Sequence, residues 1–345
     1  MPLIQAVRQL KSRDQEVYLV GGAVRDVVLQ RDIHDLDFVT GGEVRGLARR
    51  VADRLQGAFY MLDAERDTAR VVLNQAPFAG MVLDFARYRA GDLEGDLRGR
   101  DFTVNAMALH LERITEMIDP LGGAQDLRNK HLRLCSANAM QDDPVRTLRA
   151  LRVAVGFDMR LLPETIQALR AAVPGLAQVS AERQRDELFN ILAGKRVATS
   201  VRLLDHFGLL EQILPEIFLL KGQEQGPPHI YDVWEHTLAL LKALETLLDL
   251  LAMQPFSTEG SANLHVGLAA LRLGRFRPQL AQLFARPITA DRSRRALLFL
   301  GALYHDASKP QNRSVGENGK VHFYRHDEDG EPLAAARAQA LALSQ

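Results

Sequence analysis

Short apolar runs and amphipathic segments alternate over the first part of the chain. Runs of alternating or apolar residues favour strands, whereas apolar positions spaced three or four residues apart favour helices. The pattern predicts two helices, over residues 23–30 and 43–55, and five strands, over residues 17–20, 35–39, 58–62, 71–73 and 81–85. We therefore expect residues 1–134 to form an α/β unit, here called the head, with a mixed sheet and flanking helices.

Helical spacing dominates from residue 142 onward. Apolar residues recur at helical intervals over residues 142–155, 163–172, 181–193 and 198–207. A polar stretch rich in Gly and Pro predicts a linker over residues 221–228, and residues 253–263 are expected to form a loop. We expect an all-helical neck over residues 135–220 and a third, helical unit over residues 221–345. This third unit is expected to be C-terminally incomplete, because the chain stops within an alanine-rich helical stretch, residues 332–343.

Composition and charge are those of an ordinary soluble globular protein. The 345 residues suffice for two or three packed units, and 47% of them are hydrophobic. The 43 Lys and Arg residues are balanced by 43 Asp and Glu residues, which argues against a protein that coats nucleic acid non-specifically but allows a local basic groove. The single cysteine, Cys135, excludes an internal disulfide and a cysteine-rich zinc site. With its polar N-terminus and no apolar stretch of membrane-spanning length, the chain is expected to be cytoplasmic and to contact no membrane.

Two carboxylates one residue apart indicate a metal site in the head. Asp35 and Asp37 flank Leu36, and in a strand both acids would point to one face while Leu36 faces the core. Paired carboxylate oxygens at this spacing can hold Mg²⁺. Considered alone, an Asp-x-Asp pair is more often part of a solvated strand face.

Features around this pair favour phosphate chemistry. Upstream, Gly21 and Gly22 end a strand before a helix, where backbone N–H groups can approach phosphate and Arg25 can reach it. No P-loop pattern occurs, so the phosphate site must be of another type. A third carboxylate, Asp84, lies in the last predicted strand and would complete a two-metal site. The alternative for Asp84 is a salt bridge to Arg87 or Arg89.

A second polar motif follows in the sequence GRDFTVNAM. Arg100, Asp101 and Asn105 have the donors and acceptors needed to hold ribose hydroxyls and phosphate. Asp101 and Asn105 are four residues apart and would share a helix face. On local chemistry alone, a helix N-cap is the better interpretation of Asp101.

The order of these motifs resembles a known family. LVGGAVRD, then DLD, GRDFTVNAMAL and the turn DPLGGAQDL are similar to the class II tRNA nucleotidyltransferases and bacterial poly(A) polymerases. The resemblance implies a nucleotidyltransferase head in which Asp35 and Asp37 bind Mg²⁺ and Asp84 is the third catalytic carboxylate. It also implies that Arg100, Asp101 and Asn105 bind the nucleotide, in addition to the phosphate contacts expected of Gly21, Gly22 and Arg25.

The sequence DDPVR at the start of the helical region resembles the family's Glu-Asp-x-x-Arg motif, with Asp142 in place of Glu. A carboxylate at Asp143 and a guanidinium at Arg146 match an exocyclic amine beside a ring acceptor, as in cytosine and adenine. Guanine and uracil would mismatch both contacts, so this pair is expected to select C and A. Arg149 and Arg152 add basic charge that suits a triphosphate or an RNA 3′ end, and Arg183 is the expected polar contributor of the neck. For Asp143 and Arg146, the alternative to base selection is an i,i+3 salt bridge at the start of a helix.

Histidines of the third unit resemble those of the HD domain, a helical metal-dependent phosphohydrolase fold. His236, the adjacent pair His305 and Asp306, and His326 form a possible metal set. Imidazole together with carboxylate favours a transition metal. Ala307 and Ser308 depart from the usual pattern between the HD pair and Lys309, so an inherited structural core is the alternative to an active hydrolase.

The sequence therefore predicts a template-independent tRNA 3′-end nucleotidyltransferase that uses CTP for CC addition, or CTP and ATP for CCA addition. The segment 87–98 is short where many CCA-adding relatives carry a longer loop, which resembles enzymes that add only CC. Three alternatives stay open: a poly(A) polymerase with the same head, an HD-type phosphohydrolase or phosphodiesterase, and an RNA-binding protein without catalysis. The sequence makes no prediction of oligomeric state.

Overall fold

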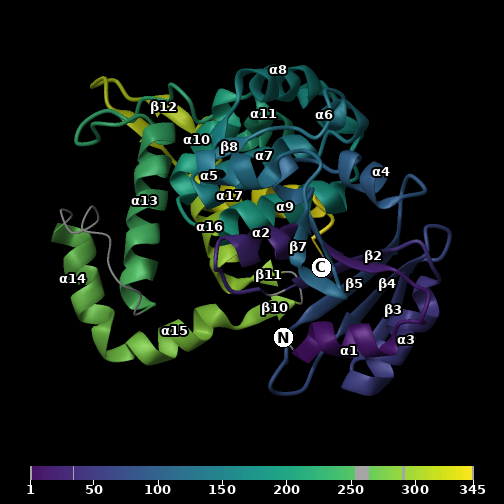
Figure 1. Ribbon diagram of the computed structural model, residues 1–345. Helices are drawn as coiled ribbons and strands as arrows, with labels where there is room; N and C mark the ends of the chain where they lie inside the picture. Colours follow the sequence, from purple (N-terminus) through teal and green to yellow (C-terminus); the bar gives the residue numbers. More distant parts are fainter. Residues whose placement is uncertain (1, 34, 253–263, 290–291, 344–345) are drawn as a thin grey trace. The chain divides into compact units, whose positions relative to one another are not determined.

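The computed structural model describes residues 2–33, 35–252, 264–289 and 292–343 (Figure 1). The chain forms two compact units. The head unit contains Met1–Asp142 and Met159–Ala168, and the helical unit contains Asp143–Asp158 and Leu169–Gln345. The loop expected over residues 253–263 lies outside the described residues.

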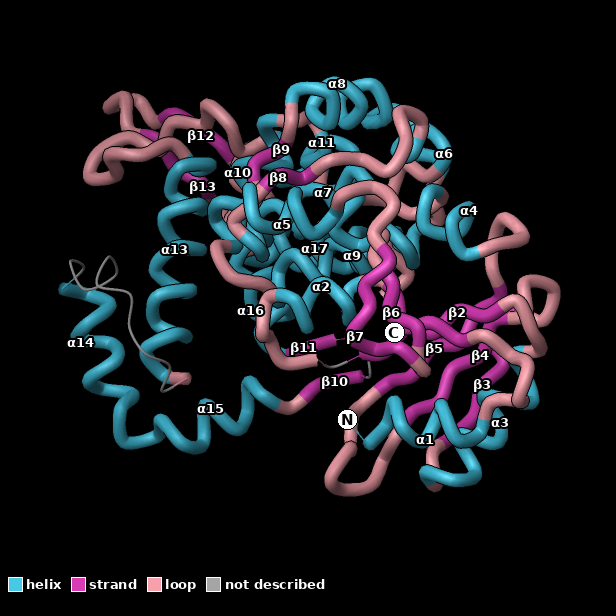
Figure 2. The backbone as a smooth tube through the Cα atoms, in the orientation of Figure 1, coloured by secondary structure: helices cyan, strands magenta, loops and turns pink. Residues whose placement is uncertain are grey.

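A seven-stranded mixed sheet forms the centre of the head unit (Figure 2). The strand order is β3-β4-β5-β2-β1-β6-β7, in which β2 and β5 are parallel and the other neighbours are antiparallel. The strands are β1 (Val17–Val20), β2 (Asp35–Thr40), β3 (Ala58–Asp63), β4 (Thr68–Val72), β5 (Val82–Arg87), β6 (Ala108–His110) and β7 (Arg113–Ile118). The predicted mixed sheet with flanking helices is therefore confirmed.

Five of these strands were predicted, and two were not. β1 has its predicted bounds, whereas β4 begins three residues before the predicted start. β6 is only three residues long, and β7 has no buried residue, so neither has the apolar alternation that marks a half-buried strand.

Helices flank the sheet in the head unit. They are α1 (Pro2–Leu10), α2 (Gly22–Val28), α3 (Val44–Leu55), α4 (Leu93–Arg98), the 3₁₀ turn η1 (Thr103–Asn105), α5 (Gly123–Asn129) and α6 (Ala139–Asp142). A two-residue parallel pair, β8 (His131–Leu132) with β9 (Arg160–Leu161), completes the unit. α3 packs on β3, β4 and β5, and it buries Leu47 and Val51. Phe38 and Phe85 are stacked and fully buried on the strands, so an apolar core lies on this side of the sheet.

The opposite face of the sheet is covered over β1 and β6. There Tyr18, Val20, Val39, Leu97, Ala106 and Ala108 form an apolar cluster, to which α4 contributes Leu97. Such a cluster stabilises α4 beside the sheet because apolar surface leaves water.

The helical unit contains most of the predicted helices. They are α7 (Arg146–Phe157), η2 (Val173–Gln178), α9 (Ala181–Ala193), α10 (Val197–His206), α11 (Leu209–Ile213), α12 (Pro215–Phe218), α13 (Val233–Leu251), α14 (Leu264–Leu273), η4 (Gly274–Phe276), α15 (Arg277–Ala285), α16 (Arg294–Tyr304) and α17 (His326–Ala340). α8 (Pro163–Ala172) has its residues up to Ala168 in the head unit. α9 contacts α7 and α16, and α13 contacts α10 and α16, so the neck helices and the later helices pack on one another. None of the described helices is both long and apolar enough to span a membrane.

Some details of the helical region differ from the predictions. Two antiparallel strand pairs interrupt the helices, β10 (Pro287–Thr289) with β11 (Arg292–Ser293) and β12 (Arg313–Val315) with β13 (Val321–Phe323), and their strands are too short to show a period. α17 begins at His326, six residues before the predicted start, and accommodates Pro332. The predicted linker is partly packed, because Gln225 is 5% exposed and accepts a hydrogen bond from Lys309.

Candidate active site

β2 carries two acidic side chains on one face of the head sheet. Asp35 and Asp37 are separated by Leu36, whose side chain is fully buried. Because successive side chains of a strand point to opposite faces, the two carboxylates share the face opposite to Leu36. In the parallel pairing of β2 with β5, Asp37 is in register with Asp84. The three predicted acids are thus neighbours on one sheet face.

The electrostatics of these acids suit a divalent cation. Burial raises the pKa of Asp37 to about 6, with a contribution from the charges of Asp84 and Asp35 and opposition from Arg100. A cation bound beside these carboxylates would relieve their mutual repulsion, and Mg²⁺ prefers ligands of this hard-oxygen type. The residues present therefore fit a magnesium ion.

The turn between β1 and α2 requires glycine at its first position. Gly21 has φ 77° and ψ −143°, a conformation that residues with a side chain rarely adopt. A Cβ atom at this position would lie 3.0 Å from both Arg100 Nη1 and Asp37 Oδ2. The glycine thus lets the backbone pass between a carboxylate and a guanidinium, which brings all three groups into one site.

Arg25, Asn105 and Asp101 form a hydrogen-bonded chain. Arg25 Nη1 donates to Asn105 Oδ1 at 2.7 Å, and Asn105 Nδ2 donates to Asp101 Oδ1 at 3.0 Å. Asp26 binds the same arginine through both its oxygens, and the Phe102 N–H donates to Asp101 at 2.7 Å. Asp101 and Arg25 are 6% and 9% exposed. This network fixes the loop before η1, and no long helix joins Asp101 to Asn105 as the spacing had suggested.

A buried acid that the sequence did not single out positions Arg100. Asp96 on α4 is 1% exposed and accepts hydrogen bonds from Arg100 Nε at 3.2 Å and Nη2 at 3.0 Å. A guanidinium held by two bonds keeps a fixed plane. α4 therefore positions the Arg100 guanidinium, which lies beside Gly21 and Asp37.

Asp84 forms a salt bridge, but not with the arginines considered from the sequence. Arg70 on β4 is its direct partner across the antiparallel β4–β5 pair. Arg70 Nε and Nη2 donate to the two carboxylate oxygens of Asp84 at 2.8 and 2.9 Å. The proposed partners Arg87 and Arg89 are therefore wrong, because Arg87 ends the strand that carries Asp84 and Arg89 lies beyond it, whereas cross-strand register decides the contact.

The predicted base-selecting residues lie at the start of α7 in the helical unit. Asp143 precedes the helix, and Arg146 is its first residue. Arg146 Nε is 3.8 Å from Asp143 Oδ2, and Arg183 Nη2 donates to the same oxygen at 2.7 Å. Arg146 is 9% exposed, so its side chain is buried among the surrounding residues. The carboxylate and guanidinium that the sequence paired are thus close together, with Arg183 as a second partner of Asp143.

Arg149 and Arg152 both bind one buried glutamate. Their Nε atoms donate to Glu187 Oε1 at 2.7 Å and Oε2 at 2.8 Å, and Glu187 is 6% exposed. These bonds join α7 to α9. The interaction was not foreseen because Glu187 is 35 residues beyond Arg152 in the chain. A structural role is therefore established for both arginines, and their nucleotide contact stays a prediction.

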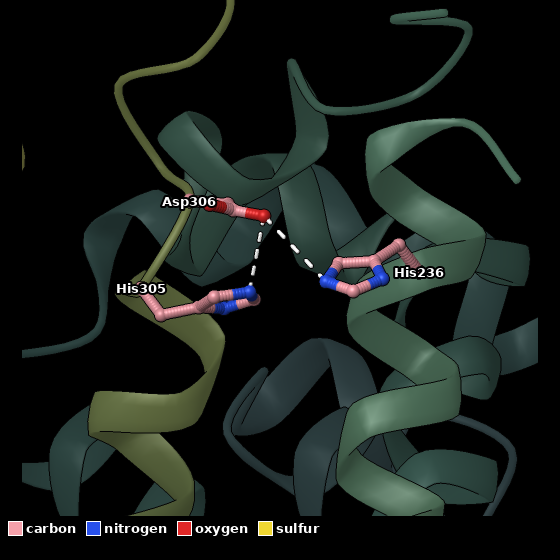
Figure 3. A group of neighbouring side chains, drawn as sticks. All are labelled: His236, His305 and Asp306. Carbon is pink, nitrogen blue, oxygen red and sulfur yellow. Dashed lines mark ion pairs between the residues drawn. The ribbon is translucent and has the colours of Figure 1, made fainter. Parts of the chain in front are cut away.

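A second polar cluster surrounds Asp306 in the helical unit, and Figure 3 shows its members His236, His305 and Asp306. Asp306 lies 3.0 Å from His305 Nε2, 3.8 Å from His236 Nε2 and 3.6 Å from His326 Nε2. One ligand atom from each of His236, His305 and Asp306 lies within 4.8 Å of the others. These residues come from α13, the end of α16 and the start of α17. The four residues named from the sequence are thus neighbours in space.

Hydrogen bonds in this cluster favour imidazole as a metal ligand. His305 Nδ1 faces the Ala302 carbonyl at 2.8 Å, and His326 Nδ1 faces the Phe323 carbonyl at 2.7 Å. A carbonyl acceptor places a proton on Nδ1, so Nε2 donates to Asp306 in the charged ring and is the ligating atom in the neutral ring. Both Nε2 atoms are the ones that approach Asp306.

The charge balance of the cluster is set by Asp306 and a buried lysine. Burial alone would raise the pKa of Asp306, but hydrogen bonds from His305 and Lys309 outweigh it and lower that pKa to about 2. Lys309 Nζ lies 2.8 Å from Asp306 and also donates to Gln225 Oε1 at 2.7 Å. Burial lowers the pKa of His236 despite the nearby Asp306 charge, which favours the neutral form that binds metals. The donor set fits a transition metal.

Comparison with known proteins supports the head motifs. Residues 17–133 match the family described as the poly A polymerase head domain, and residues 158–220 match a probable RNA and SrmB-binding site of polymerase A. A CC-adding tRNA nucleotidyltransferase of Geobacter sulfurreducens is 43% identical over 175 residues, covering 51% of this chain and 40% of the relative. An A-adding tRNA nucleotidyltransferase of Deinococcus radiodurans is 38% identical over 233 residues, covering 66% of this chain and 52% of the relative.

Solved structures agree with these relatives. A tRNA nucleotidyltransferase in complex with a primer tRNA and an incoming ATP analogue matches with a TM-score of 0.58 and 27% identity, covering 81% of this chain and 79% of that one. The chain spans about half the length of the two relatives described above, 40% and 52%. Residues 17–133 therefore form a poly(A) polymerase head domain, in a chain whose homologues are CC-, A- and CCA-adding tRNA nucleotidyltransferases.

Proposed function

We propose that this chain transfers cytidylate from CTP to the 3′ end of tRNA and releases pyrophosphate. The observation that carries the proposal is the convergence of Asp35, Asp37 and Asp84 on one sheet face, beside the Gly21 turn and the Arg100 guanidinium. Phosphoryl transfer depends mainly on positioning and charge stabilisation, which this arrangement supplies. Homology to CC- and A-adding enzymes supports the same reaction class.

The reaction joins the RNA 3′-oxygen to the α-phosphorus of CTP and breaks the bond from that phosphorus to the departing pyrophosphate. Mg²⁺ held by Asp35 and Asp37, with Asp84 beside them, would lower the pKa of the RNA 3′-hydroxyl and offset charge on pyrophosphate. The backbone of Gly21 and Gly22 and the side chain of Arg100 would hold the triphosphate. Arg25, through Asn105, would keep this loop in place.

Base selection is assigned to Asp143 and Arg146. Arg146→Ala is expected to lower the preference for CTP over UTP about tenfold, since a matched polar contact to a base contributes about 1–3 kcal/mol of discrimination. The ratio of kcat/KM values for the two nucleotides measures the effect. Arg170→Ala, which removes an exposed arginine of α8, is the control. Unchanged discrimination in Arg146→Ala would remove the selector role.

The number and kind of nucleotides added distinguish CC addition from CCA addition and from poly(A) synthesis. The segment between β5 and the GRDFTVNAM motif contains only the six-residue helix α4 and its flanking turns, which supports CC addition. The test uses three tRNAs that end before the first C, before the second C and before A, each with CTP, ATP or both.

We expect CTP to extend the first two tRNAs and ATP alone to extend none of them. Extension of the third tRNA by ATP would instead support CCA or A addition, and a long A tail on any RNA would support a poly(A) polymerase. RNA binding without extension of any end would contradict the proposed activity and favour a passive binder.

A second function is proposed for the cluster around Asp306. The imidazoles of His236 and His305 and the carboxylate of Asp306, with His326 beside the other oxygen of that carboxylate, suit a transition metal that would activate water for hydrolysis of a phosphoester. The observation that favours it is that Nδ1 of both His305 and His326 faces a backbone carbonyl, so that each Nε2 faces the Asp306 carboxylate. The substrate class is a phosphomonoester or a phosphodiester.

A further inference from the structure

A row of directly paired residues crosses the head sheet from β2 to its edge strand. Asp37 is in register with Asp84, Asp84 with Arg70, and Arg70 with Tyr60. Residues in direct register on neighbouring strands point to the same face of a sheet. The strand order β2, β5, β4 and β3 can be followed in Figure 2. Arg70 and Tyr60 therefore lie on the same sheet face as the catalytic acids.

Exposure rises along this row. The side chains of Asp84 and Arg70 are 27% and 36% exposed, and Tyr60 is 53% exposed. The neighbouring residues that point to the other face, such as Val71 and Leu83, are fully buried on the side where α3 packs. The row is thus an accessible surface that continues outward from the acids, and α3 does not cover it.

The row lies on one side of Asp37, and the Gly21 turn that is proposed to hold the triphosphate lies on the other side. Gly21 follows β1, which adjoins β2 on one side, whereas Asp84, Arg70 and Tyr60 occupy β5, β4 and β3 on the other side. In phosphoryl transfer the attacking and leaving oxygens are roughly in line through phosphorus. If pyrophosphate departs on the β1 side, the attacking RNA 3′-hydroxyl must approach from the β5 side.

The chemistry of the row matches the end of an RNA chain. At about 4.8 Å between strands, Arg70 is about 10 Å and Tyr60 about 14 Å from Asp37 across the sheet, the reach of a terminal nucleotide and its neighbour. The plane of the Arg70 guanidinium is fixed by its bidentate pair with Asp84. Arginine is a preferred partner of phosphate, and an exposed tyrosine ring is a stacking surface for any base.

We propose that Arg70 and Tyr60 bind the 3′ end of the RNA that is extended, with Arg70 at its last phosphodiester and Tyr60 under a base. This assignment rests on the proposed nucleotidyl transfer. Asp84 then has two roles: it orients Arg70, and it contributes a carboxylate to the metal-binding face. The same contacts would favour single-stranded ends of any sequence, because stacking on tyrosine does not read the base.

The test separates RNA binding from nucleotide binding. Tyr60→Ala is expected to raise the KM for a tRNA lacking its 3′ CCA about tenfold, with the KM for CTP unchanged, while Tyr60→Phe restores the wild-type value. Arg70→Lys is expected to raise the same KM several-fold, because lysine keeps the charge but loses the bidentate fork. Tyr324→Ala, which removes a tyrosine that is 66% exposed in the helical unit, is the matched control.

Direct binding gives a readout that needs no catalysis. The dissociation constant of the same tRNA with a 3′-deoxy end is expected to rise about tenfold in Tyr60→Ala and to remain unchanged in Tyr324→Ala. A rise in the KM for CTP without a change for RNA would overturn the proposal, as would wild-type RNA affinity in both Tyr60→Ala and Arg70→Lys. A wild-type protein that binds the RNA through Tyr60 but adds no nucleotide would contradict the proposed function and leave the binding site supported.

Discussion

Replacing Asp37 by asparagine is expected to reduce CTP incorporation about a thousandfold, because the change removes a charged ligand from the metal-binding face. Asp37 lies at the centre of that face, in register with Asp84 on β5 and with Val20 at the end of β1. The measurement is single-turnover extension of a tRNA lacking its 3′ CCA at saturating CTP and Mg²⁺. Asp53→Asn, an exposed acid on α3, is the control and should retain wild-type activity.

The same variant is expected to be more stable than the wild-type protein at pH 8 in EDTA. The pKa of Asp37 is raised from 3.8 to about 6 by burial first and by neighbouring acids second. A raised carboxyl pKa means that the folded protein loses stability as the pH rises from about 4 through about 6, by about 3 kcal/mol. Asparagine does not ionise, so the gain should appear at pH 8 and vanish at pH 4.

This combination of lost activity and gained stability is specific to a functional acid. An activity loss caused by misfolding would be accompanied by a lower unfolding free energy, which urea denaturation at both pH values measures. Wild-type incorporation by Asp37→Asn would contradict the assignment of the metal site. A variant that is less stable than the wild-type protein at pH 8 would contradict the electrostatic account of this residue.

His305→Ala is expected to weaken binding of Ni²⁺ or Mn²⁺ at the helical-unit cluster by about a hundredfold or more, since it removes a direct ligand. His305 is suited to the test because its side chain is 32% exposed, whereas Asp306 is almost fully buried and holds Lys309. Metal binding is measured by calorimetry, and hydrolysis is measured with p-nitrophenyl phosphate and bis-p-nitrophenyl phosphate. CTP incorporation with Mg²⁺ should be unaffected.

His322→Ala provides the matched control for this cluster. His322 lies on β13 and stacks on Tyr324, and it is not among the residues that approach Asp306. Metal-dependent hydrolysis that is lost in His305→Ala and kept in His322→Ala would support the second function. Equal metal affinity in the wild-type protein and in His305→Ala would show that the cluster is a structural ion-pair network.

The sequence predicted the elements that have a strong period and missed those that depend on register. β1, β2, β3 and β5 were placed from their apolar pattern, and the Asp35–Leu36–Asp37 alternation located one sheet face. The pairing of Arg70 with Asp84 could not be read from the chain, because it depends on which strands are neighbours and on their alignment. Short or exposed strands such as β6 and β7 carry no periodic signal.

The same distinction applies to the candidate sites. The spacing of three residues correctly predicted that Asp143 and Arg146 lie close together. It could not reveal that Glu187 binds both Arg149 and Arg152, or that buried Asp96 holds Arg100. The His236, His305 and His326 cluster was anticipated only through resemblance to the HD domain, because these residues are far apart in the chain and come together around Asp306 in the folded unit.

The central claim is that the site formed by the acids on β2 catalyses nucleotidyl transfer rather than hydrolysis of a phosphoester. It is tested most directly by following primer extension and pyrophosphate release together, with purified protein, a tRNA lacking its 3′ CCA, CTP and Mg²⁺. We predict one pyrophosphate for each C added, with both signals lost in Asp35→Ala and retained in His305→Ala. Release of inorganic phosphate without extension, unchanged in Asp35→Ala and abolished in His305→Ala, would contradict the account.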